Sequence, residues 1–85
     1  MSSSDVMSLG QLPRGKKGII SRLGSPDYSS HIVERLMHMG LLEGALVEVM
    51  HEAPFGKDPI AVKVRGSLIA LRRHEANAVE VCFHE

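Results

Sequence analysis

The sequence is poor in cysteine and aromatic residues: its 85 residues include one cysteine, no tryptophan, one tyrosine and two phenylalanines. A single cysteine, Cys82, excludes a disulfide within the chain. No apolar run approaches the ~18 residues that a membrane-spanning helix requires. The N-terminus also lacks the basic-then-apolar pattern of a secretory signal. These absences predict a cytoplasmic protein that reaches a membrane only through a partner.

The chain also lacks an excess of charge of either sign, because ten Lys and Arg residues balance ten Asp and Glu residues. A neutral molecule has no long-range field that draws it onto nucleic acid, and three aromatic residues offer few surfaces for stacking bases. Without tryptophan, an aromatic groove for proline-rich peptides is excluded as well. We therefore expect no nucleic-acid partner, and we expect any charged binding to be confined to patches.

The length allows one domain with one core. Residues 1–8 have too little apolar content to join that core, and we expect a disordered tail there, followed by a single domain over 9–85. Leu9 and Leu12 are expected to cover one end of the core. Residues 18–23 read as a first strand. Ser25 and Pro26 then favour the start of a helix at about residue 27, and Gly40 suits its end after Met39.

The remaining sequence alternates between apolar and polar residues, which is typical of half-buried strands. Strands are expected over 45–53, 60–65, 68–72 and 79–85, with one helical turn before the last. Such short strands gain most by curling into a barrel, which removes exposed edges. The predicted fold class is all-β with one inserted helix, a small SH3-like β-barrel of about five short strands.

Two segments resemble a known family. The segments "RLMHMGLLEG" (residues 35–44) and "DPIAVKVRGSLIALRRHEA" (residues 58–76), taken together, are similar to ferrous-iron transport protein A, FeoA. The resemblance extends from Leu9 to Phe83. The same pattern is similar to the SH3-like C-terminal domain of iron- and manganese-dependent repressors. No winged helix or dimerisation region accompanies it here, which favours the free-standing transport protein.

The resemblance implies a non-enzymatic accessory of bacterial ferrous-iron uptake that requires no cofactor. It implies a partner, the FeoB-type membrane transporter, which carries a cytosolic GTPase domain. Docking on that domain and modulating the transporter is therefore the expected function. The alternative for so small a barrel is a domain with only a structural or oligomerisation role.

The end of the predicted helix is rich in flexible apolar side chains. A helix has only one inward stripe, so these side chains cannot all be buried in a small body. We expect a partner-facing patch here, and a homodimer contact is the alternative use of the same patch. Its members are Met37, Met39, Leu41 and Leu42.

Three basic residues, Lys63, Arg65 and Arg72, are expected on the outward side of the hairpin over 60–72, with Arg73 as a less secure fourth. They predict a basic patch that faces an acidic region of a partner. The alternative is a solvated strand face whose basic side chains prevent edge-to-edge aggregation. Arg65 or Arg72 acting on a nucleotide held by the partner is a further, weaker hypothesis.

Metal binding is the remaining hypothesis, because the side chains include ligand types that suit Fe²⁺ or Zn²⁺. The histidines form no i, i+4 helical pair, and Cys82 and His84 lie about 7 Å apart along one strand face. We favour the interpretation that these are ordinary surface residues. The alternative is a weak site for a divalent metal ion. Such a site would make the protein a metal-responsive regulatory or sensing domain, which is the alternative function. The candidates are His31, His38, His51, Glu52, Cys82 and His84.

Catalysis has little support in the sequence. Cys82 with His84 is the one nucleophile and base pair worth considering, and no third group orients it. A phosphate-binding loop of the G-x-x-x-x-G-K-[ST] type does not occur. We therefore expect a protein that binds a partner and is not an enzyme.

Overall fold

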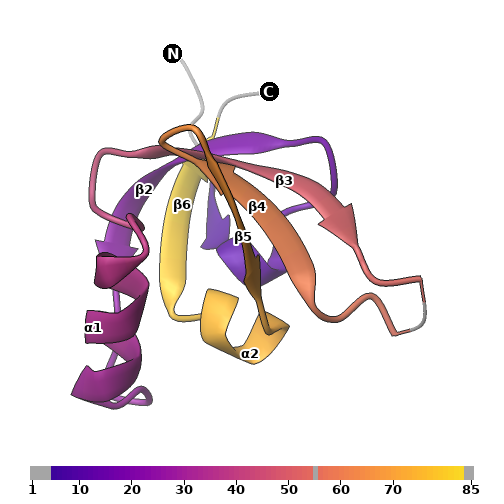
Figure 1. Ribbon diagram of the computed structural model, residues 1–85. Coiled ribbons are helices and arrows are strands. Elements are labelled where there is room, and N and C mark those ends of the chain that lie inside the picture. Colours follow the sequence, from indigo (N-terminus) through magenta and orange to yellow (C-terminus); the bar gives the residue numbers. More distant parts are fainter. Residues whose placement is uncertain (1–4, 55, 84–85) are drawn as a thin grey trace.

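A computed structural model of the chain describes residues 5–54 and 56–83 (Figure 1). Short strands dominate it, with one helix of nine residues and two single helical turns. The elements, in chain order, are β1 (Asp5–Ser8), η1 (Leu9–Gln11), β2 (Lys17–Leu23), α1 (Ser30–His38), β3 (Leu46–Glu52), β4 (Ile60–Val64), β5 (Ser67–Leu71), α2 (Arg73–Ala76) and β6 (Val79–Phe83). No helix in the described part of the chain is long and apolar enough to cross a membrane.

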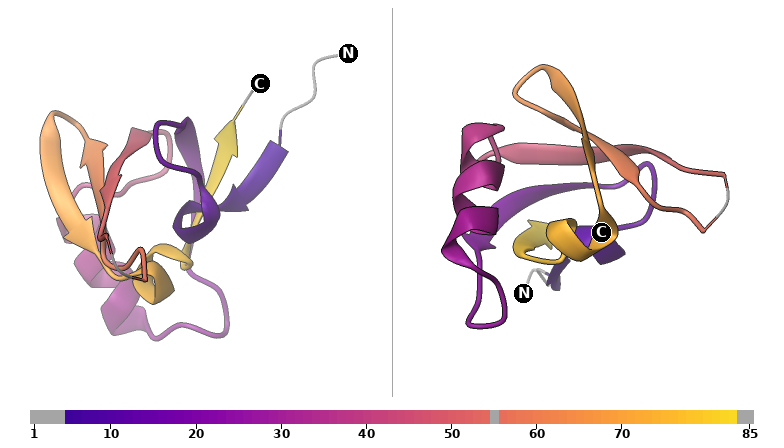
Figure 2. Two further views of the ribbon diagram at one scale, coloured as in Figure 1. Left: turned by 90° about the vertical axis from the view of Figure 1, so that its right-hand side faces the viewer. Right: turned by 60° about the horizontal axis from the view of Figure 1, so that its bottom comes forward.

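All six strands belong to one antiparallel sheet in the order β1-β6-β2-β3-β4-β5. The sheet curls around the core, and Figure 2 shows its two end strands, β1 in indigo and β5 in orange, on opposite sides of the molecule. The pairing register shifts once in β2, between Ile20 and Arg22, and once in β3, between Val49 and His51. Such irregularities bend a strand and increase its twist, which lets a sheet of short strands wrap tightly.

β1 corrects the expected disordered tail. Residues 5–8 pair with β6, and Met7 lies opposite Val81 and packs against the core. An edge strand forms by pairing with the free edge of a neighbouring strand. The low apolar content of residues 5–8 therefore did not prevent β1 from forming. The tail prediction is therefore wrong for residues 5–8, and the described residues form six strands where about five were expected. Residues 1–4 lie outside the described residues.

The interior is aliphatic, and no polar or charged side chain in the described part is buried. The alternating apolar residues of β3, β4 and β6 face inward, as their spacing predicts: Val47, Val49, Ile60, Val62, Val64, Val79 and Val81 are buried, and Phe83 is partly buried. At Gly18 a Cβ atom would lie 3.1 Å from Cβ of Val81, so β2 and β6 cross closely at this point. The buried apolar residues are Leu9, Leu12, Ile20, Leu36, Leu41, Val47, Val49, Ile60, Val62, Val64, Leu71, Ala76, Ala78, Val79 and Val81.

α1 begins three residues later than expected, at Ser30. The hydroxyl of Ser29 accepts a hydrogen bond from the backbone N–H of Ile32 at 3.3 Å, which makes Ser29 the N-cap. Ser25 instead starts a turn, in which its carbonyl accepts from the N–H of Tyr28 at 3.0 Å. The predicted end is confirmed, because Gly40 adopts a left-handed conformation (φ 95°) directly after the last turn.

Arg73 occupies a position that the sequence did not indicate. Its backbone N–H donates to Asp58 Oδ1 at 3.0 Å, and its Nε donates to the Lys57 carbonyl at 2.6 Å. The remaining guanidinium nitrogens contact the Gly10 carbonyl and Glu52 Oε2, the latter at 2.6 Å. The expectation of an outward Arg73 is therefore wrong, since this side chain joins η1, β3, α2 and the loop before β4.

Candidate functional site

The helix end presents fewer apolar groups than expected. Met37 is exposed, at 44%, whereas Met39 and Leu42 are partly buried. Leu41 is fully buried, which overturns its assignment to a partner-facing patch. The cause is the turn at Gly40, which lets the N–H of Leu41 donate to the Leu36 carbonyl at 3.1 Å and brings the Leu41 side chain into the core.

Of the three predicted basic residues, the structure places Arg65 next to the helix end. Arg65 lies in the two-residue turn between β4 and β5, and a Cβ atom at Gly40 would lie 3.6 Å from Arg65 Cδ. A cation near a helix C-terminus interacts favourably with the helix dipole. The turn and the end of α1 at Gly40, which are far apart in sequence, therefore lie side by side.

Arg72 lies apart from this turn. It is exposed and precedes α2 at the far end of β5. Four residue steps separate Leu71 from Ser67, a distance of about 13 Å along a strand. The three basic residues therefore do not form one patch, and only Lys63 and Arg65 remain neighbours.

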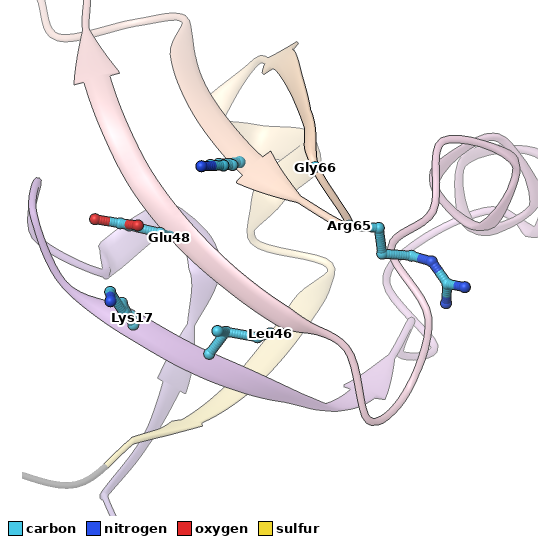
Figure 3. A pocket seen from close by; sticks show the side chains of 6 residues that line it. Lys17, Leu46, Glu48, Arg65 and Gly66 are labelled. Atoms are coloured by element: carbon cyan, nitrogen blue, oxygen red, sulfur yellow. The ribbon is translucent and has the colours of Figure 1, made fainter.

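Lys63 and Arg65 line a shallow groove of about 400 Å³ on the outer face of β2, β3 and β4 (Figure 3). Glu48 lies opposite Lys17 on one side and opposite Lys63 on the other. In Figure 3 the side chains of Lys17 and Glu48 leave the same face of the sheet, whereas Arg65 points away from them. The lining residues are Lys17, Leu46, Glu48, Lys63, Arg65 and Gly66.

Sequence reasoning missed Lys17, Leu46 and Glu48 as groove residues. Alternation places Glu48 on the outer face of its strand, but the position of Lys17 beside it depends on the register between β2 and β3. Because register is set by the whole sheet and its turns, a single sequence carries little signal for it. The arrangement provides two ammonium groups, one carboxylate and one apolar side chain on one surface, a set that suits binding of a charged partner segment.

The metal-ligand candidates among the described residues do not come together. His31, His38 and His51 are exposed on α1 and β3. Glu52 is paired with Arg73, and Cys82 is half-buried on the outer face of β6. Within residues 5–54 and 56–83, no three His, Cys, Asp or Glu residues gather as a metal site would require.

His84 lies outside the described residues, so its proposed pairing with Cys82 receives no test. The donor set in the described part therefore does not fit a resident metal ion.

Comparison with known proteins identifies the family. The sequence model of the FeoA domain matches residues 7–82. A crystal structure of an iron uptake regulatory protein, FeoA, superposes with a TM-score of 0.77 at 30% identity and covers 91% of this chain and 96% of that chain. The zinc complex of Stenotrophomonas maltophilia FeoA, described as a prokaryotic SH3 domain protein, gives 0.77 at 29% identity and covers 88% of each chain.

The fold extends beyond this family. A manganese-dependent transcriptional repressor superposes with a TM-score of 0.78 at 18% identity, over 93% of this chain and 42% of that chain, which shows a shared fold alone. A search of proteins with curated annotation gives no match at the sequence level. The expected SH3-like fold is confirmed, and the chain belongs to the FeoA family, which is linked to ferrous-iron transport.

Proposed function

We propose that this chain is a non-enzymatic accessory of ferrous-iron uptake that docks on the cytosolic part of a FeoB-type transporter and changes its transport activity. The match of the FeoA domain over residues 7–82 carries the proposal, because it spans nearly the whole chain. Membership of the family links the chain to ferrous-iron transport. The transporter as partner and the effect on its activity are what we propose.

The surface of the molecule supports a docking role. The groove offers Lys17 and Lys63 to an acidic partner region, and charged groups of this kind give orientation and faster encounter. Met37, near the end of α1, adds an exposed flexible side chain of a type that adapts to a partner surface. Of the residues first considered for partner binding, Leu41 is excluded by its burial, and Arg72 lies apart from the rest.

The related Stenotrophomonas maltophilia protein is described as a candidate activating factor of ferrous-iron transport. By analogy, we expect this chain to activate its transporter. Deleting its gene should lower the initial rate of ⁵⁵Fe²⁺ uptake in cells that keep the transporter, and restoring the gene should recover the rate. The chain should also co-purify with the full-length transporter in lipid nanodiscs. Unchanged uptake together with no co-purification would remove the proposed function.

A metal-responsive domain was the alternative function, and no observation here favours it. The described residues bring no three ligand side chains together, and Glu52 is paired with Arg73. The zinc in the Stenotrophomonas maltophilia structure is a property of that protein. We therefore propose the docking function alone.

A further inference from the structure

Four apolar side chains from four adjacent strands lie in one row across the outer face of the sheet. Val6 in β1 is opposite Cys82 in β6, Cys82 is opposite Ile19 in β2, and Ile19 is opposite Leu46 in β3. Directly opposite residues have their Cβ atoms about 5 Å apart and share one face of a sheet. These four residues, Val6, Cys82, Ile19 and Leu46, form a continuous strip that we call the apolar band.

The band is open to solvent. Val6 is 55% exposed, Ile19 43% and Leu46 52%, and these three are among only five large hydrophobic side chains that are exposed in the described part of the chain. The outward positions of an antiparallel sheet with one solvated face are normally polar. A contiguous exposed apolar strip on a small domain is typical of an interaction surface.

The groove joins the band at Leu46, which belongs to both. The next row of the sheet holds Lys17, Glu48 and Lys63 as cross-strand neighbours. Among the described residues, the ion pairs within 4 Å are Arg35 with Glu75 and Arg73 with Glu52, so neither lysine of this row is engaged. Two ammonium groups against one carboxylate make this row locally positive on a chain of zero net charge.

We infer that the groove and the apolar band together bind one extended segment of a partner protein in which acidic side chains adjoin apolar ones. The acidic side chains lie over Lys17 and Lys63, and the apolar side chains lie along the band. The charge of the groove favours an acidic occupant. The band crosses three inter-strand spacings, about 14 Å, which four residues of extended chain span. The identity of the partner as the transporter rests on the proposed function.

A second copy of this chain is a poorer occupant. In a two-fold symmetric dimer the same patch lies on both sides of the contact, so the locally positive row of one copy would face the patch that carries the same positive row in the other copy. A partner segment with carboxylates avoids this charge repulsion. The experiment below separates the two occupants, and it also separates both from a lipid surface.

Cys82 reports directly on occupancy, because it is the only cysteine and lies in the middle of the band. The rate of its alkylation by N-ethylmaleimide would be measured with full-length transporter in nanodiscs and with empty nanodiscs. At a transporter concentration ten times the Kd, about nine-tenths of the chain is bound, and the rate should fall about tenfold. The unmodified chain serves throughout, so folding of a variant is not at issue.

Substitutions in the groove and the band test the same surface by affinity. Leu46→Asp, and separately the pair Lys17→Glu and Lys63→Glu, should each weaken binding to the transporter at least about tenfold, which corresponds to about 1.4 kcal/mol. The pair Arg14→Glu and Lys16→Glu is the control, since it makes the same charge change at exposed positions outside the groove lining. This control pair should bind within about threefold of the unsubstituted chain.

Each contrary result has its own meaning. Unchanged alkylation while the chain still co-purifies with the transporter overturns this inference and leaves the proposed function standing. Failure to co-purify, with unchanged iron uptake, overturns the proposed function and the inference with it. Slower alkylation at higher concentration of the chain alone, with a dimer in sedimentation velocity, assigns the band to a second copy instead. Slower alkylation with empty nanodiscs assigns it to a lipid surface.

Discussion

The adjacent residues Arg72 and Arg73 have different structural roles. The Arg72 side chain is exposed, and the backbone N–H of this residue donates a hydrogen bond to Glu75 Oε1 at 3.2 Å. The Arg73 side chain is only 27% exposed and contacts two backbone carbonyls and Glu52. A guanidinium carries five donors in a planar fork, and it can therefore join several acceptors from different segments at once.

Replacement of Arg73 by Ala should lower the free energy of unfolding by about 2 kcal/mol, because it removes hydrogen bonds to a charged donor and leaves the carbonyls of Gly10 and Lys57 without this partner. Arg72→Ala is the matched control and should change stability by less than about 0.5 kcal/mol. Urea denaturation of the two variants measures the difference. Equal stabilities would contradict the role given to Arg73.

At the scale of single elements, α1 shows why helix ends are hard to locate from sequence. Ser25 and Ser29 are both good N-cap residues, and Pro26 after the first favours a helix start there. The chain instead forms a turn from Ser25 to Tyr28 and starts the helix at Ser30. The end of α1 at Gly40 was readable from the sequence, but the choice between two N-caps depends on how the preceding turn joins the sheet.

Ser29→Ala should destabilise the protein by about 1 kcal/mol, since it removes the acceptor of the Ile32 N–H. Ser30→Ala lies one residue further on, inside the first turn, and should leave stability unchanged or slightly raised, because Ala has the higher helix propensity. Thermal unfolding monitored by circular dichroism compares the two. A loss of stability in Ser30→Ala as large as that in Ser29→Ala would contradict the assignment of Ser29 as the N-cap.

β1 was missed for a different reason. Its partner strand β6 is more than 70 residues away in sequence, since Asp5 lies opposite Phe83, so no local pattern signals the pairing. Deleting residues 1–8 should expose one edge of β6 and the core surface under Met7. We expect faster amide hydrogen exchange in Val79–Phe83 and a lower midpoint of unfolding. Unchanged exchange in β6 would contradict a stabilising role for β1.

At the scale of the whole molecule, the predictable part is the core and the less predictable part is the surface. Alternation identified the inward faces of β3, β4 and β6 because burial imposes a period of two on each strand separately. The groove and the apolar band arise from residues on different strands, so they exist only once register is set. Lys63 and Arg65 were found from sequence, whereas Lys17, Leu46 and Ile19 joined them through pairing with other strands.

Binding that combines a charged groove with an apolar band should depend only partly on salt. The screening length falls from about 10 Å at 0.1 M to about 3 Å at 1 M ionic strength, which weakens the contribution of Lys17 and Lys63. Burial of the band is not screened by salt. Affinity for the full-length transporter should therefore fall with rising salt and level off. For the Lys17→Glu and Lys63→Glu pair the dependence should be reversed, because the substituted row repels the acidic segment and salt screens that repulsion. A complete loss of binding at high salt would contradict a role for the band.

The docking account is tested most directly by hydroxyl-radical footprinting of the chain with and without full-length transporter in nanodiscs. The account predicts that binding slows oxidation of Leu46 and Ile19, while the exposed Pro54, on the loop between β3 and β4, reacts at its original rate. Unchanged oxidation of Leu46 and Ile19 at saturating transporter, or protection confined to that loop, would contradict it.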